Sequence, residues 1–291
     1  MSRYRSTRPD PRSKLTPPFL RRMAEIPEKR QAGRFPFTLP FMRRGGFALE
    51  LTNPITILVG ENGTGKSSLL EAIARNAGFN ARGGSRDNDY GGDSDESGLA
   101  AALTLSWLPK VTKGFFFRAE SFFNFVTYVE DAYLHSPYIP PWGERSLHHR
   151  SHGEAFLSFF QARLGSHERC LYLLDEPEAA LSPERQLEFM AMLEEQRATG
   201  KVQYIIATHS PLLMAFAGAD LLHFSYRGLH RTTLELTPHF RIYRDFCREP
   251  QEFLEAQLAR IAAERAEALS AIDEAAERGT ADRETGSSEE D

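Results

Sequence analysis

Residues 60–67 decide the fold of this chain, and they read Gly60-Glu61-Asn62-Gly63-Thr64-Gly65-Lys66-Ser67. They satisfy the pattern G-x-x-x-x-G-K-[ST] in full. The β-branched, apolar residues 55–59 precede the stretch, and residues 67–75 carry the apolar spacing of a helix that ends at Gly78. A strand, a glycine-rich turn and a helix in this order predict a loop whose backbone N–H groups surround a phosphate.

The side chains of this loop indicate which phosphate compound binds. Lys66 is expected to reach the β- and γ-phosphates of ATP, and the Ser67 hydroxyl to ligate Mg²⁺. Ser68 and the remaining loop residues are expected to contact the nucleotide. The cofactors predicted from this stretch are therefore ATP and Mg²⁺.

Polar residues follow two further apolar segments. Residues 170–174 lead into Asp175 and Glu176, and residues 202–207 lead towards His209. Ligands of open parallel sheets collect at the carboxyl ends of strands, so Asp175 is expected beside Ser67 on the magnesium. Glu176 is expected to polarise the attacking water as a general base, and His209 to donate a hydrogen bond to the γ-phosphate.

Strand and helix patterns alternate along the chain, which predicts an α/β fold with a mainly parallel sheet flanked by helices. The expected strands are residues 47–51, 55–59, 103–107, 114–118, 170–174 and 202–207, with an edge hairpin at 221–226 and 232–236. The expected helices are residues 67–75, 121–133, 154–164, 183–197 and 250–277.

Composition divides the chain into four segments. A basic, Pro- and Arg-rich arm spans residues 1–44, and its first 33 residues are expected to be coil. An ATPase domain follows at 45–248, with a Gly/Asp/Ser-rich mobile loop at 81–98. A helix at 249–278 and a disordered acidic tail at 279–291 complete the chain.

Charge is distributed unevenly between these segments. The arm holds 12 Lys/Arg and three Asp/Glu, a balance of +9, so with a net charge of −5 the remainder carries −14. Such an arm suits a nucleic-acid partner, although a merely solvated arm has the same composition.

Bulk properties are those of an ordinary globular chain, with 41% hydrophobic residues. No apolar run approaches the roughly 20 residues of a membrane-spanning helix, and no secretory pattern follows the start. Cys170 and Cys247 show no metal-type spacing and are expected to be reduced, buried thiols. These features predict a cytoplasmic protein with no integral membrane segment.

Together the three strand-end segments resemble those of the ATP-binding-cassette (ABC) ATPase superfamily of P-loop NTPases, and their order agrees. That family carries a signature, LSGGQ or SGGE, at the start of a helix before the acid strand, where this chain has Ser151-His152-Gly153-Glu154. His152 stands where the first glycine of the pair is usual. The resemblance implies that Ser151, Gly153 and Glu154 contact ATP bound by a second copy in an ATP-dependent homodimer, although an ordinary capped helix starts in the same way. Residues 180–183 resemble the loop that follows the acid pair and contacts the other subunit.

One family element is missing. A glutamine normally lies between the phosphate loop and the signature, near the magnesium, but residues 67–150 contain none. Residues 114–121 occupy its place, so Arg118 or Glu120 is expected to substitute for it, with Glu120 as a metal ligand. Either residue also fits a salt bridge at a strand end.

The sequences DEPEAALSP (residues 175–183) and ATHSP (residues 207–211) resemble those of soluble repair, SMC-like and phage-defence ATPases more than those of transporter subunits. Only 85 residues separate Lys66 from Ser151 (151 − 66), which leaves no room for coiled-coil arms. The resemblance implies an ATP-driven dimerisation switch that acts on an unidentified protein partner in DNA repair or phage defence. A transporter ATPase subunit and an ATP-gated nucleic-acid-binding protein stay open as alternatives.

Overall fold

A computed structural model describes residues 15–86, 98–134, 139–143, 145–164 and 168–286. The chain forms two compact units, Met1–Thr237 and Pro238–Asp291. Among the described helices, none is both long and apolar enough to cross a membrane.

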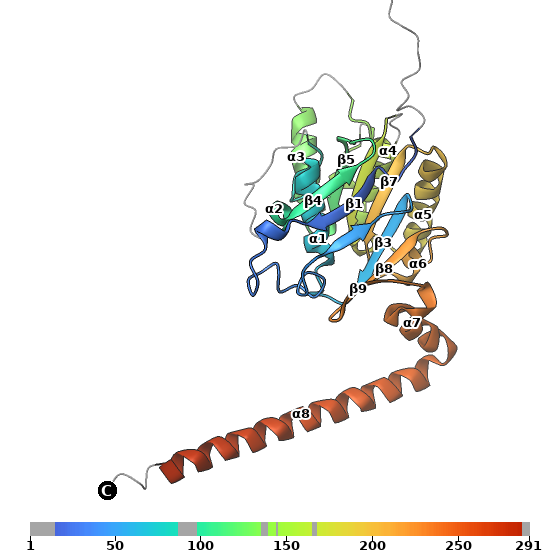
Figure 1. Cartoon of the computed structure of the whole chain (residues 1–291). Helices are drawn as coiled ribbons and strands as arrows, with labels where there is room; N and C mark the ends of the chain where they lie inside the picture. The colour runs from blue at the N-terminus through green and yellow to red at the C-terminus, as the bar shows by residue number, and fades with distance from the viewer. Residues whose placement is uncertain (1–14, 87–97, 135–138, 144, 165–167, 287–291) are drawn as a thin grey trace, which may run out of the picture. The chain divides into compact units, whose positions relative to one another are not determined.

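A six-stranded sheet forms the centre of the first unit (Figure 1). Its strands lie in the order β5 (Lys113–Arg118), β6 (Cys170–Asp175), β7 (Val202–Ala207), β3 (Ile55–Gly60), β8 (Asp220–Ser225) and β9 (Gly228–Thr232). The first five run parallel, and β9 pairs antiparallel with β8. The carboxyl ends of β3, β6 and β7 therefore meet at one edge.

Both faces of this sheet are covered. Successive side chains of a strand point to opposite faces, and here the two sets belong to two different cores. In β6, Leu171 and Leu173 belong to one core, whereas Tyr172 and Leu174 belong to the other. All six residues of β6 are buried, which is why this segment reads as a continuous apolar run rather than an alternating one.

Helices separate into two layers. The core that contains Tyr172 and Leu174 packs the sheet against α3 (Phe122–Leu134), α4 (His152–Leu164) and α5 (Pro183–Ala198). On the other face, α1 (Lys66–Ala77) lies between the main sheet and a second, three-stranded sheet. The remaining helical pieces of this unit are short: α2 (Leu99–Ala102), α6 (Pro211–Met214), η2 (Pro27–Lys29), η3 (Ala119–Ser121), η4 (Leu147–His149), η5 (Pro177–Ala180) and η6 (Leu234–Leu236).

The second sheet corrects the expectation that residues 1–33 are coil. It is antiparallel, in the order β2 (Ala48–Glu50), β1 (Leu20–Glu25) and β4 (Leu103–Trp107). A register shift between Leu20 and Arg22 places the buried Leu20 and Met23 three residues apart. This irregularity breaks the period-two pattern by which a strand is recognised. Residues 1–14 lie outside the described part of the chain.

Three further expectations need correction. The second hairpin strand was expected at residues 232–236. It is β9 instead and begins at Gly228, because the turn at Tyr226 and Arg227 is only two residues long. In the loop predicted to be mobile, Gly84 forms a bridge with Phe116 and Ser85 is buried, whereas residues 87–97 lie outside the described residues. Cys247 is exposed, although Cys170 is buried as expected, and both are free thiols.

The second unit consists of α7 (Pro238–Arg248) and α8 (Pro250–Gly286). Residues 238–248 were expected inside the ATPase domain, and a disordered tail was expected from 279. The helix instead continues to Gly286, because Ala, Glu and Arg favour helix strongly enough to outweigh one glycine, which costs about 1 kcal/mol. Residues 287–291 lie outside the described part.

One buried glutamine joins the two sheets of the first unit. The Gln203 side chain on β7 accepts hydrogen bonds from the backbone N–H groups of Phe19 and Leu20, both at 2.8 Å. It also donates to the Leu20 carbonyl at 3.0 Å.

Gln203→Ala would leave three buried backbone groups unpaired. We expect the free energy of unfolding to fall by about 2–4 kcal/mol in urea denaturation. Gln161→Ala, at an exposed position of α4, is the control; an equal loss in both variants would contradict this role.

Candidate active site

The phosphate loop turns directly from β3 into α1, and its glycines make that turn sterically accessible. Gly60 has φ 145°, and a Cβ atom there would lie 2.2 Å from the Phe224 carbonyl oxygen. Gly65, whose φ is 97°, directly precedes Lys66, the first residue of α1. The Thr64 hydroxyl closes the loop by donating to the Glu61 carbonyl at 2.7 Å. This is the strand–loop–helix unit expected from the sequence.

Lys66 lies inside the loop. Its Nζ donates to the carbonyl oxygens of Gly60 at 2.6 Å and Glu61 at 3.1 Å. Burial lowers the pKa of the Lys66 ammonium, and the carboxylates of Glu176 and Asp175 oppose this shift. An ammonium held at a helix start among backbone dipoles suits a phosphate group, whose charged oxygens are stronger acceptors than carbonyls.

Ser67 and Asp175 come together from different elements. Ser67 Oγ, in the first turn of α1, donates to Asp175 Oδ1 at the end of β6 over 3.0 Å. Burial raises the pKa of Asp175 to about 6, although the Ser67 hydrogen bond and the Arg118 charge oppose the shift.

The oxygens of this pair fit a hard divalent cation such as Mg²⁺. Among the described residues, no group of three or more His, Cys, Asp or Glu side chains could enclose a metal. Phosphate oxygens and water would have to complete the coordination shell, as Mg²⁺ sites at nucleotides usually require.

Glu176 occupies a strained position at the edge of the site. With φ 52° and ψ 51°, it is the one non-glycine residue with positive φ in the described part of the chain. Such conformations cost about 1–3 kcal/mol and collect at functional sites. The side chain is partly exposed, and its Oε1 lies 3.6 Å from His209 Nε2.

His209 follows β7, the strand between β6 and β3. Burial lowers the pKa of its imidazole, and the charge of Lys66 adds to this effect. Its backbone N–H donates to Glu178 Oε1 at 2.5 Å. Glu178 is half-buried, and the burial of its carboxyl raises its pKa. This carboxyl fixes the turn after β6 to the end of β7, a role missed by the sequence analysis despite the second glutamate of the Asp-Glu-Pro-Glu run.

A cavity of about 200 Å³ opens between these residues. Its lining includes Asn62, Gly63, Gly65, Lys66, Ser67, Ser68 and Glu176. Two apolar residues of the N-terminal segment, Phe35 and Leu39, complete the wall. Neither was expected at this site, because their segment was assigned to the arm.

The segment that replaces the missing glutamine places Arg118 beside Asp175. Arg118 Nε lies 3.9 Å from Asp175 Oδ2, and its guanidinium also reaches Glu71 Oε2 at 3.5 Å. Glu120 is 72% exposed and forms an ion pair with Arg118. The negative charge of Glu120 contributes to the raised pKa of Asp175, so it lies within electrostatic range.

The predicted signature residues form a reciprocal cap at the start of α4. Glu154 N–H donates to Ser151 Oγ at 3.3 Å, and Ser151 N–H donates to Glu154 Oε2 at 3.0 Å. Gly153 approaches the turn after β6, where a Cβ atom would lie 3.3 Å from the Ala180 carbonyl oxygen. These three residues do not line the cavity at the phosphate loop.

Two family models match parts of the chain, and both describe AAA domains. One is described as "AAA domain, putative AbiEii toxin, Type IV TA system" and matches residues 155–215, which include the acid pair and His209. The other, an AAA domain, matches residues 39–101, which include the phosphate loop. No curated protein matches the chain at a significant level.

The solved structures that match the chain are distant in sequence. CbiO1 from Clostridium perfringens, part of the ABC transporter complex cbiONQ, is 15% identical with a TM-score of 0.44, over 73% of this chain and 91% of that one. An ATP-binding cassette of an ABC transporter in its ADP conformation is 15% identical with a TM-score of 0.46, over 73% and 89%. The SMC head domain from Thermotoga maritima is 17% identical with a TM-score of 0.42, over 74% and 98%.

The mainly parallel sheet, the phosphate loop and the strand-end acid pair define a P-loop ATPase. The two AAA-domain matches, one over the phosphate loop and one over the acid pair, agree with this class.

Asp175 provides a pH-dependent test of this site. Because burial raises its pKa from 3.8 to about 6, the folded chain retains a proton between these values that the unfolded chain has released. The stability of the nucleotide-free protein should therefore fall as the pH rises through this window. We expect Asp175→Asn to unfold with a free energy about 2–3 kcal/mol higher than wild type at pH 8, and a smaller gain at pH 5. Urea denaturation at both pH values checks this, with the exposed Glu168→Gln as control. A gain independent of pH would contradict it.

Proposed function

We propose that this ATPase is an ATP-driven dimerisation switch whose active site is completed by a second copy. One observation carries the proposal. One edge of the sheet brings together Lys66, Ser67, Asp175 and Glu176. The signature-like residues Ser151–Glu154 do not line the cavity at the phosphate loop. A signature that lies away from the phosphate loop of its own chain suits a nucleotide site that is shared between two protomers.

Within such a site each side chain has a separate role. Lys66 and the loop N–H groups bind the phosphates, and Ser67 and Asp175 would hold Mg²⁺, which would supply positive charge to neutralise the phosphate oxygens. Glu176 accepts a proton from the attacking water, and His209 donates a hydrogen bond to the γ-phosphate. Arg118, with Glu120 beside it, takes the place of the missing glutamine and orients Asp175.

The biological role that we favour is DNA repair or phage defence, through a protein partner that the switch engages in the cytoplasm. One matched family model includes a type IV toxin–antitoxin system in its description, which is compatible with a defence role. A transporter ATPase subunit is the second candidate, and stable co-purification with an integral-membrane protein would favour it. We also propose that the basic arm of residues 1–44 contributes to nucleic-acid binding, because it carries a charge of +9.

The Glu176→Gln variant tests the switch directly. Without a general base, ATP turnover should fall about 100-fold or more, while binding persists. The variant should therefore accumulate as an ATP-bound dimer when its mass is measured by light scattering with Mg²⁺ and ATP. Lys66→Ala, which loses the phosphate contact, should stay monomeric under the same conditions. A Glu176→Gln variant that is monomeric at saturating ATP would contradict the model.

Mixing two inactive variants tests whether the site is shared. Lys66→Ala removes the phosphate contact of one protomer, and Ser151→Arg blocks the signature that serves the other. In a mixed dimer, one of the two sites receives an intact Lys66 and an intact Ser151. Only the mixed dimer has an intact site, so an equimolar mixture should turn over ATP well above the background of either variant alone.

The matched control mixes Lys66→Ala with Asp175→Asn. Both changes affect the same half of the site, so neither mixed site is intact and turnover should stay at background. Recovery in both mixtures, or in neither, would contradict the proposed division between the halves.

A further inference from the structure

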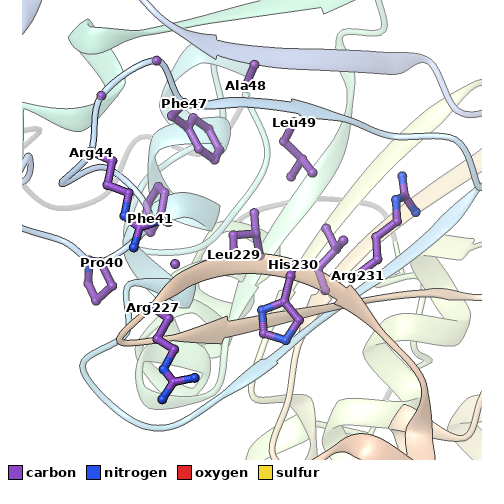
Figure 2. Close-up of a pocket in the computed structure, with 14 residues that line it drawn as sticks. Pro40, Phe41, Arg44, Phe47, Ala48, Leu49, Arg227, Leu229, His230 and Arg231 are labelled. Atoms are coloured by element: carbon purple, nitrogen blue, oxygen red, sulfur yellow. The ribbon is translucent and has the colours of Figure 1, made fainter.

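A second cavity, of about 380 Å³, lies between residues 40–49 and the β8–β9 hairpin (Figure 2). It shares no lining residue with the cavity at the phosphate loop. None of the residues assigned to ATP binding or hydrolysis lines it. Its two walls come from parts of the sequence about 180 residues apart, so only the folded chain brings them together.

Charge in this cavity is of one sign. Arg44 on one wall and Arg227 and Arg231 on the other line it, together with His230 (Figure 2). No Asp or Glu is among the described residues that line it. Arg231 forms an ion pair with Asp220 at 2.6 Å. Arg44 and Arg227 are exposed, and neither forms an ion pair with a carboxylate in the part of the chain that the structure describes. Two guanidinium groups are thus left to bind an anion.

The walls are held in place by packing and by one hydrogen bond. The Phe41 ring lies edge-on to Phe47, at 5.1 Å between centroids, and to Phe224 at 5.4 Å. Arg43 donates to the Tyr226 carbonyl oxygen at 3.3 Å and so joins the two walls. The arginines therefore extend from a preformed frame, which lowers the entropic cost of binding a ligand.

An exposed aromatic residue lies beside the cavity. Tyr226 is 68% exposed in the two-residue turn and directly precedes Arg227. An exposed ring next to a cationic groove is the arrangement by which proteins bind single strands: bases stack on the ring, and arginines contact phosphates. A duplex keeps its bases stacked internally and cannot use such a ring.

We propose that this cavity binds the backbone of a single-stranded nucleic acid, with a phosphate between Arg44 and Arg227 and a base stacked on Tyr226. The site combines the end of the basic arm with the hairpin, so it does not reduce to the arm alone. Binding here does not depend on ATP hydrolysis, and the two proposals can fail separately.

Fluorescence anisotropy of the full chain with labelled oligo(dT), in the absence of nucleotide, tests the site. The Arg44→Ala/Arg227→Ala double variant should bind at least about tenfold more weakly. The slope of log affinity against log salt should shrink by about 0.7 for each lost phosphate contact. Tyr226→Ala should weaken binding about tenfold, and Tyr226→Phe should bind like wild type because the ring is kept. Unchanged affinity in the double variant would overturn the site.

Controls separate this site from general charge and from ATP binding. Lys201→Ala removes an exposed cation that lies outside both the basic arm and this cavity, and it should leave the affinity unchanged. Lys66→Ala should abolish ATP binding but not strand binding; loss of both would overturn the assignment to a separate site. Duplex DNA that binds as tightly as the single strand, or AMP that displaces the strand at equal nucleotide concentration, would overturn the assignment of the ligand.

Discussion

The hydrogen bond from Ser67 to Asp175 joins the two halves of the ATPase site. Ser67 lies at the start of α1, and Asp175 ends β6, which is separated from the phosphate-loop strand by β7. The parallel register brings both to the same edge, and α1 is held there by packing between the two sheets. If that packing shifted by an ångström, the hydroxyl and carboxylate could no longer ligate one cation. The position of α1 is therefore the constraint on which the chemistry depends.

This edge is built at a cost to stability. A buried carboxyl at Asp175, a buried ammonium at Lys66 and left-handed backbone at Glu176 each disfavour the nucleotide-free fold. They are held by groups around them: Gln203 binds β1 to β7, and Glu178 fixes the turn after β6. The unfavourable interactions thus collect where a nucleotide and a cation would relieve them, as is usual for functional sites.

Much of this arrangement was predictable from the sequence, because the relevant signals are local. The phosphate loop, its strand and its helix are contiguous, and residues 202–207 formed the expected strand because a short buried segment with β-branched and aromatic residues favours that conformation. The strand β1 was not predictable, since its register shift hides the alternation and its partners lie in distant segments. Phe35 and Leu39 were missed at the cavity for the same reason, as only the tertiary fold brings that segment to the phosphate loop.

The start of α4 shows why local and functional interpretations of one motif need not compete. Ser151 and Glu154 satisfy each other's backbone donors, so within a single chain the motif is fully explained as a helix cap. Both residues are exposed, and Arg185 lies 4.0 Å from the Glu154 carboxylate. A phosphate arriving from a second protomer would meet the positive end of a 13-residue helix, but it would also meet this carboxylate. In the proposed dimer, Glu154 would therefore have to turn towards Arg185 as the nucleotide approaches. The cap would keep the helix start ordered in the monomer, and its displacement would couple nucleotide binding to closure.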